Sequence, residues 1–136
     1  YDGVLDTAFL LNAIPQRYQD LGLGDVDTYF AMARGYQGTA GDVKAFSMKK
    51  WFNTNYHYMV PEIEDTVDIK LQSSTFLDGY RQAKALGIET KPVLVGPFTF
   101  LKLADFVGKK TVADVLPAIL AAYEDIFKVA EEQGVA

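Results

Sequence analysis

The segment KPVLVGP, Lys91 to Pro97, decides the fold that we expect for this chain of 136 residues. Its centre is entirely apolar, and a proline stands near each end. A short apolar run of this kind is typical of a β-strand that is buried on both faces, as the strands of parallel sheets are. Because parallel strands are joined through crossover connections, which are usually helical, helices should lie on both sides of the segment.

Helical periodicity is present on both sides. Before the segment, a helix should begin at Ser73 or Ser74 and end at Gly87, and after it helices are expected over 98–106 and 115–133. Asp114 is the expected N-cap of the last helix, which would place Pro117 in the first turn, where a missing N–H has no helical partner. The apolar stripes are Phe76, Leu77, Tyr80, Ala83 and Leu86 in the first helix, and Ile119, Leu120, Tyr123, Ile126, Phe127 and Ala130 in the last.

The first half of the chain is predicted to be mainly helical. We expect helices over 3–13, from Asp25 or Asp27 onward, and from Asp42 to Lys49, with an exposed glycine-rich loop over 34–42. Strands are expected at 55–60 and, from weaker alternation, at 67–71. The whole pattern predicts an α/β protein with parallel main strands, either a doubly wound sheet or an incomplete (β/α)8 barrel.

The barrel interpretation requires a longer parent chain, because two or three strands cannot close a barrel. The start at Tyr1 without a methionine, and the stop just after Gly134, favour the same interpretation. The net charge of −5 argues against nucleic acid as a partner, and no apolar run reaches the ~20 residues of a membrane span. The chain has no cysteine and one histidine, which excludes disulfides and thiolate zinc sites. We expect a cytoplasmic protein.

The stretch KKWFNTNYHYMVPE, Lys49 to Glu62, is unusually rich in aromatic rings and hydrogen-bonding side chains. Taken singly, its residues have ordinary explanations: Lys49 and Lys50 suit a helix C-terminus, and His57 lacks an evident partner for acid–base catalysis. The following carboxylates, Glu62 to Asp68, are explained better by a solvated loop than by a cation site. Thr99, just past the predicted strand, is either a ligand contact or a helix cap.

Together, however, the residues of MKKWFNTNYHYMVPE (48–62) resemble the signature of the cobalamin-independent methionine synthase family. Three further stretches carry the same resemblance in the family's order: YDGVLDTAFLLNAIPQRY (1–18), DVDTYFAMARG (25–35) and KPVLVGPFTFLKLAD (91–105). Members of this family transfer a methyl group from 5-methyltetrahydropteroyltri-L-glutamate to L-homocysteine to form L-methionine. The resemblance covers nearly the whole chain.

The resemblance implies a placement and a role. Enzymes of the family contain two (β/α)8 barrels, and residues 1–136 would be one internal piece of the N-terminal barrel, packed against the C-terminal catalytic barrel. Lys50 matches the family lysine that binds the folate polyglutamate tail, while Asn55, His57 and Thr99 are weaker candidates for substrate binding. No residue of this chain would be catalytic or bind metal, because the zinc ligands lie outside it.

Alone, the chain would therefore be inactive and free of cofactor, and its open barrel edges would favour self-association. Two alternatives remain: a purely structural scaffold segment, or an unrelated α/β enzyme that uses Thr99 and His57.

Overall fold

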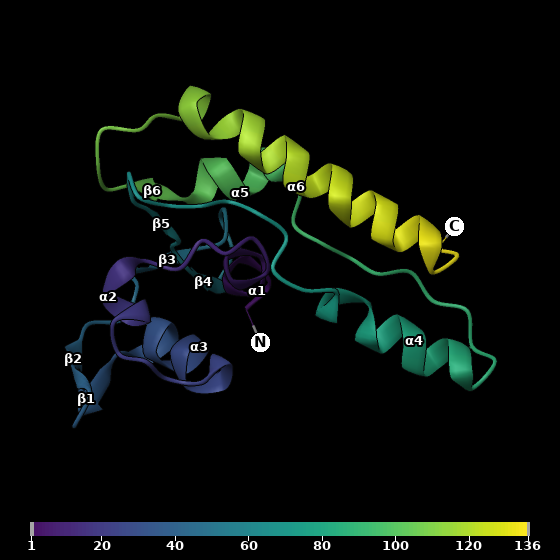
Figure 1. Cartoon of the computed structure of the whole chain (residues 1–136), viewed down its shortest axis with the longest axis horizontal. Coiled ribbons are helices and arrows are strands. Elements are labelled where there is room, and N and C mark those ends of the chain that lie inside the picture. The colour runs from purple at the N-terminus through teal and green to yellow at the C-terminus, as the bar shows by residue number, and fades with distance from the viewer. Residues whose placement is uncertain (1, 136) are drawn as a thin grey trace.

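The computed structural model describes residues 2–135, which form six α-helices, one 3-10 helix and six short strands. Figure 1 shows the long last helix running along the upper side of the molecule, with the first helix near the centre. In chain order the elements are α1 (Gly3–Leu10), α2 (Gln16–Gln19), α3 (Asp25–Arg34), β1 (Tyr36–Gly38), β2 (Gly41–Val43), β3 (Met48–Lys50), β4 (His57–Met59), β5 (Glu62–Ile63), η1 (Thr75–Leu77), α4 (Asp78–Ala85), α5 (Pro97–Leu103), β6 (Asp105–Phe106) and α6 (Val112–Glu132).

The strands pair two by two. β1 with β2 and β3 with β4 are antiparallel hairpins, whereas β5 and β6 are parallel, with Glu62 opposite Asp105 and Ile63 opposite Phe106. The chain between β5 and β6 contains α4 and α5, so the parallel pair is joined through helices as expected. The expected mixture of helix and strand is therefore confirmed at the level of an α/β class.

Helix α1 separates two apolar cores. On one side Val4 and Ala8 belong to a cluster that includes Phe100 of α5 and Ile119 of α6. On the other side Leu5 belongs to a second cluster, formed with side chains of α2 and the turn after it, α3, the segment before β3, and β4: Tyr18, Leu21, Ala31, Met32, Phe46 and Met59. Apolar residues on nearly every face of α1 explain why this helix is buried by both halves of the chain.

The last helix is confirmed but begins earlier than predicted. Its N-cap is Thr111, and Asp114 stands three residues later in a capping box, so Asp114 is not the cap itself. Pro117 consequently lies inside α6 rather than in its first turn, and it deprives the carbonyl of Ala113 of its helical partner. Of the predicted stripe, Ile119, Tyr123 and Ile126 are buried; Leu120 and Phe127 are exposed.

The segment 91–96 is irregular and forms no strand, so this prediction was wrong. Val93 is 91% exposed, whereas Leu94 and Val95 pack against the larger core. The hydroxyl of Tyr123 on α6 donates a hydrogen bond to the carbonyl of Val95. A strand requires a neighbour to complete its backbone ladder, and no strand within residues 2–135 pairs with this segment. An apolar sequence alone does not supply that neighbour.

The predicted helix from Asp42 to Lys49 is also wrong, because this stretch contains β2, an irregular turn and β3. Gly35 and Gly41 adopt positive φ angles of 81° and 129°, which end α3 and shape the β1–β2 hairpin. Phe46 lies between β2 and β3, outside any helix or strand. Its ring is buried, and its N–H donates to the carbonyl of Met32 at 2.8 Å.

The weaker strand predicted at 67–71 is absent from the described structure as well. This segment instead runs past the end of α1, where the N–H of Lys70 donates to the carbonyl of Leu11 at 3.2 Å. Helices α1, α3, α4 and α5 lie within or close to their predicted ranges. Within residues 2–135, no helix combines the length and apolarity needed to cross a membrane.

Candidate functional site on the β3–β4 hairpin

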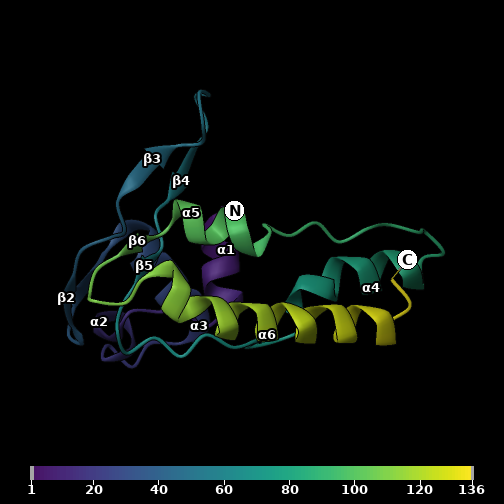
Figure 2. The ribbon, with the colours of Figure 1, turned by 90° about the horizontal axis from the view of Figure 1, so that it is seen from above.

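The stretch from Met48 to Met59 folds into an antiparallel hairpin that projects from the body of the molecule (Figure 2). Its register places Met48 opposite Met59, Lys49 opposite Tyr58, and Lys50 opposite His57. Directly opposed residues share one face of an antiparallel pair, and successive residues alternate between faces. The two adjacent lysines therefore point to opposite faces, and Lys50 shares its face with His57.

Long-range contacts fix the base of the hairpin. The N–H of Met59 donates to the carboxylate of Asp2 at 2.6 Å, and the same carboxylate caps α1 by accepting from Val4 N–H and Leu5 N–H at 2.9 and 3.1 Å. The hydroxyl of Tyr58 reaches the carbonyl of Leu103 on α5 at 3.4 Å. Thus, α1 and α5 together set the position from which the hairpin projects.

The tip of the hairpin is held by its own hydrogen bonds. The N–H of Trp51 donates to the carbonyl of Tyr56 at 2.7 Å, and the N–H and hydroxyl of Thr54 donate to the carbonyl of Trp51 at 3.2 and 2.6 Å. The ring of Trp51 packs edge-on against Phe52 and Tyr58, with centroids 5.1 and 6.0 Å apart. This network explains the many rings and polar groups: they stiffen a turn that projects into solvent.

Phe52 adopts the left-handed backbone region with φ of 51° while its side chain is 71% exposed. A bulky residue rarely occupies this region, and it persists only where the surroundings enforce it. The hydrogen bonds of Trp51 and Thr54 on either side are the enforcing contacts.

The electrostatics distinguish the two lysines. The ammonium of Lys49 forms an ion pair with Asp105 of β6 at 3.0 Å. Lys50 is exposed and takes part in none of the ion pairs within residues 2–135. An ammonium without a partner carboxylate at the end of a positioned strand is suited to bind an anion from solution.

The other candidate residues fall into two groups. Asn55 and His57 lie on the same hairpin as Lys50, and both are exposed. Thr99 lies in the first turn of α5 and is half-buried, and no hydrogen bond of the described residues links it to Lys50, Asn55 or His57. The N-cap of α5 is Gly96, so Thr99 is not a cap either. Three of the four candidates therefore lie on one hairpin, and the fourth lies on α5.

The carboxylates that follow the hairpin each have separate partners. Glu62 forms an ion pair with Arg17 at 2.5 Å, Glu64 accepts from the N–H of Gln16 at 2.9 Å, and Asp68 pairs with Lys70. Asp65 accepts from the N–H groups of Lys109 and Lys110 at 2.7 and 2.8 Å. Between residues 2 and 135, no group of three His, Cys, Asp or Glu side chains could hold a metal ion.

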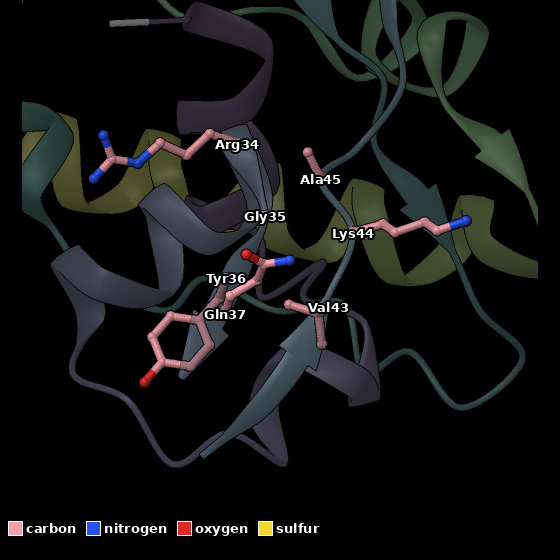
Figure 3. A pocket seen from close by; sticks show the side chains of 7 residues that line it. All are labelled: Arg34, Gly35, Tyr36, Gln37, Val43, Lys44 and Ala45. Carbon is pink, nitrogen blue, oxygen red and sulfur yellow. The ribbon is translucent and has the colours of Figure 1, made fainter. Parts of the chain in front are cut away.

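A separate hollow of about 520 Å³ lies beside the β1–β2 hairpin and is lined by Arg34, Tyr36, Gln37 and Lys44, among others. Figure 3 shows the cations of Arg34 and Lys44 pointing away from one another, so they do not converge on a common ligand. The guanidinium of Arg34 lies over the ring of Phe30, 4.9 Å from its centroid. This hollow therefore lacks the convergent polar groups of a binding site.

Two residues of the site were missed from the sequence: Asp2, which links α1 to β4, and Asp105, which neutralises Lys49. Asp2 carried a partial signal, because an aspartate before an apolar helix is a common N-cap. Its second contact, with Met59, has no local signature.

The fold and the hairpin define an α/β protein segment that exposes Lys50, a lysine without an ion-pair partner among the described residues, on a positioned strand. Comparison with known proteins makes this more specific: the model of the family described as "Cobalamin-independent synthase, N-terminal domain" matches residues 1–136. The chain belongs to this family, which confirms the resemblance seen in its sequence.

Similar proteins bear the name 5-methyltetrahydropteroyltriglutamate–homocysteine methyltransferase. Those of Streptococcus thermophilus and Streptococcus suis are 51% and 53% identical over 134 residues, or 98% of this chain. The protein of Bifidobacterium longum subsp. infantis is 55% identical, with 93% of the chain covered. The chain spans only 18% of the length of each of these relatives.

Proposed function

We propose that these 136 residues form part of a methyltransferase that moves a methyl group from 5-methyltetrahydropteroyltriglutamate to homocysteine, and that Lys50 binds the glutamate tail of the folate substrate. The names of the relatives support the reaction and the two substrates. This part of the enzyme would bind substrate without carrying out chemistry.

The contrast between two adjacent lysines is the observation that supports tail binding. Lys49 is neutralised by Asp105, whereas Lys50, on the other face of the strand, has no ion-pair partner among the described residues. A triglutamate tail presents several carboxylates, and a charged contact of this exposed kind contributes about 0.2–1 kcal/mol. The bracing of the hairpin by Asp2 reduces the entropy lost when the tail binds.

We further propose that residues 1–136 are one internal piece of an N-terminal (β/α)8 barrel. The parallel pairing of β5 with β6 through intervening helices supports this fold, as does the family's description as an N-terminal domain. In the complete barrel, the segment 91–96 would gain the strand neighbours that are absent among residues 2–135.

Zinc, which the family resemblance implies for the complete enzyme, does not fit the residues present. The chain has no cysteine and a single histidine, and no group of candidate ligands gathers within residues 2–135. The ligands of the metal would therefore come from the remainder of the enzyme.

A second candidate function, a scaffold that packs against the catalytic barrel, is favoured by exposed apolar side chains. Phe98 of α5 is 76% exposed and, with Leu116 and Leu120 of α6, lines a small apolar groove of about 220 Å³. The two functions are compatible. If the chain served only as a scaffold, replacing Lys50 would not change the affinity for folate.

The experiment that tests the proposal compares Lys50→Ala with Lys49→Ala in the complete enzyme of which this chain is part. Affinity is measured by titration with the mono- and triglutamate forms of the folate. Loss of the Lys50 contact should weaken triglutamate binding by up to about fivefold, and the loss should shrink with added salt. Lys49→Ala should leave the preference for the triglutamate intact. Equal losses from both variants would count against the assignment.

A further inference from the structure

Helix α6 has an apolar side that residues 2–135 leave exposed. Val112, Leu116, Leu120 and Phe127 recur four, four and seven positions apart, so they lie along one side of the helix. Their side chains are between 40% and 69% exposed. The stretch from Val115 to Tyr123 contains no charged residue, and a helix that is apolar all round is normally buried. The complete protein should therefore cover this side.

The exposed side of α6 continues into the groove beside α5. Apart from Lys102, the residues that line this groove are apolar: Pro97, Phe98, Leu101, Val112, Leu116 and Leu120. Because the groove runs between two helices, the side-chain ridges of a third helix can pack into it. An extended segment would instead leave backbone N–H and C=O groups without partners against an apolar surface. The shape of the groove therefore favours a helical occupant.

Three polar groups border this apolar surface and indicate the chemistry of the occupant. Pro117 cannot donate to the carbonyl of Ala113, so this carbonyl remains an acceptor on an exposed part of α6. Lys102 borders the groove, and Glu124 lies one turn after Leu120. Neither Lys102 nor Glu124 forms an ion pair within residues 2–135. The occupant should carry an apolar face with one hydrogen-bond donor, flanked by an acidic and a basic side chain.

We propose that this surface of α5 and α6 is the docking site for one amphipathic helix of the same N-terminal barrel, supplied by sequence outside residues 1–136. The helices of a (β/α)8 barrel form an outer ring, so each is covered along its sides by neighbouring helices. α4 already contacts the C-terminal end of α6, where the hydroxyl of Tyr80 donates to the carbonyl of Gly134 at 2.9 Å. The exposed apolar side of α6 is left for a second neighbour.

The length of the relatives agrees with this occupant. They are several times longer than this chain, so a protein of their length contains ample sequence to supply a further helix. A helix of the same barrel suits the surface better than the catalytic barrel does, because the apolar side runs along α6 as a neighbour in the ring would. The inference rests on the proposed (β/α)8 barrel and does not depend on the role of Lys50.

The test places the photoreactive residue p-benzoylphenylalanine at Phe98 or at Phe127 of the complete enzyme and identifies the crosslinked peptides by mass spectrometry. Leu116 in the groove and Phe127 are eleven positions apart, which is about 16 Å along a helix. Both positions should therefore react with one peptide of the N-terminal barrel outside residues 1–136, at sites roughly two to four turns apart. Phe52 on the hairpin is the matched control, because it is 71% exposed and should not react with that peptide.

A smaller substitution keeps the inference testable if the photoreactive variants fold poorly. The rate of alkylation of Leu120→Cys is measured in the folded complete enzyme and in urea. A covering helix should slow the reaction of the folded protein by roughly tenfold or more, independently of protein concentration. Asp125→Cys, on the polar side of the same helix, should react at similar rates in both states.

Each other outcome would overturn the inference. Crosslinks to the catalytic barrel would support the scaffold function instead. Crosslinks to a second copy, or protection of Leu120→Cys that grows with protein concentration, would identify the surface as an interface between copies. Rapid alkylation of Leu120→Cys in the folded enzyme would show that the surface stays open to solvent. Tail binding by Lys50 is tested separately, by titration with the mono- and triglutamate, and stands or falls on that result alone.

Discussion

We expect Asp2 to stabilise the folded chain far more than a half-exposed aspartate normally does. Its carboxylate caps α1 with one oxygen and accepts from the N–H of Met59 with the other. Loss of an N-cap costs about 1 kcal/mol, and loss of a charge-assisted hydrogen bond costs about 1.5–3 kcal/mol. Asp2→Ala should therefore lower the free energy of unfolding of the chain by about 2–4 kcal/mol.

The substitution Asp2→Asn separates the two contributions. Asparagine is as good an N-cap as aspartate, but its amide has only one acceptor oxygen, so the N–H of Met59 would face an NH₂ group instead. This variant should keep the cap and lose the link to the hairpin. In urea unfolding it should lie between the wild type and Asp2→Ala, and hydrogen exchange at the Met59 amide should accelerate in both variants.

Asp27→Ala provides the control, because Asp27 lies in the first turn of α3 and makes no side-chain hydrogen bond among the described residues. It should cost a few tenths of a kcal/mol through the helix dipole alone. The reasoning would be refuted if Asp2→Ala unfolded at the same urea concentration as Asp27→Ala, or if the Met59 amide kept its protection.

Three further predictions concern α6 and the chain as a whole. Burial raises the pKa of Tyr123 to about 12, so the neutral phenol stabilises the folded state. This stabilisation is complete below the ordinary pKa near 10 and is lost as the pH rises through about 12. Tyr123→Phe should remove that loss from alkaline unfolding curves. Hydrogen bonds from the backbone N–H and side chain of Thr111 lower the pKa of Asp114. The capping box therefore stabilises α6 above the ordinary carboxyl pKa, and this stabilisation is lost as the pH falls. Circular dichroism should show a smaller loss of helicity in acid for Asp114→Asn than for the wild type. Finally, the isolated chain should self-associate through Phe98, Leu116, Leu120 and Phe127, and sedimentation of a clean monomer at high concentration would contradict this.

Helices were predictable because their signals are local. Periodic apolar residues identified α1, α4 and α6, and Ile119, Tyr123 and Ile126 are buried as expected. The same periodicity did not show which residues of a wide apolar helix face would be buried against a neighbouring element. Leu86, Leu120 and Phe127 belonged to the predicted faces but are exposed, because burial depends on neighbours that the described residues do not provide.

Strands were harder to predict because they depend on pairing. The most strand-like segment, 91–96, has no pairing partner among the described residues, whereas β3 lies where the sequence predicts the end of a helix. That error concealed the main feature of the site. On a helix, Lys49 and Lys50 would be only about 100° apart, but on a strand they face opposite ways. The pairing of Lys50 with His57, and of Lys49 with Asp105, follows only from the observed register and fold.

The anchoring of the hairpin also has a kinetic consequence. The tip can close within microseconds, since its hydrogen bonds join residues a few positions apart. Its base, in contrast, depends on Asp2 and Asp105, which contact Met59 and Lys49 across 57 and 56 residues of sequence. Contacts between such distant residues require large loops to close first, and they slow folding accordingly. During synthesis, the ion pair of Lys49 must wait until Asp105 has left the ribosome. The turn that presents Lys50 should therefore form early, and its orientation should be among the last features of this chain to become fixed.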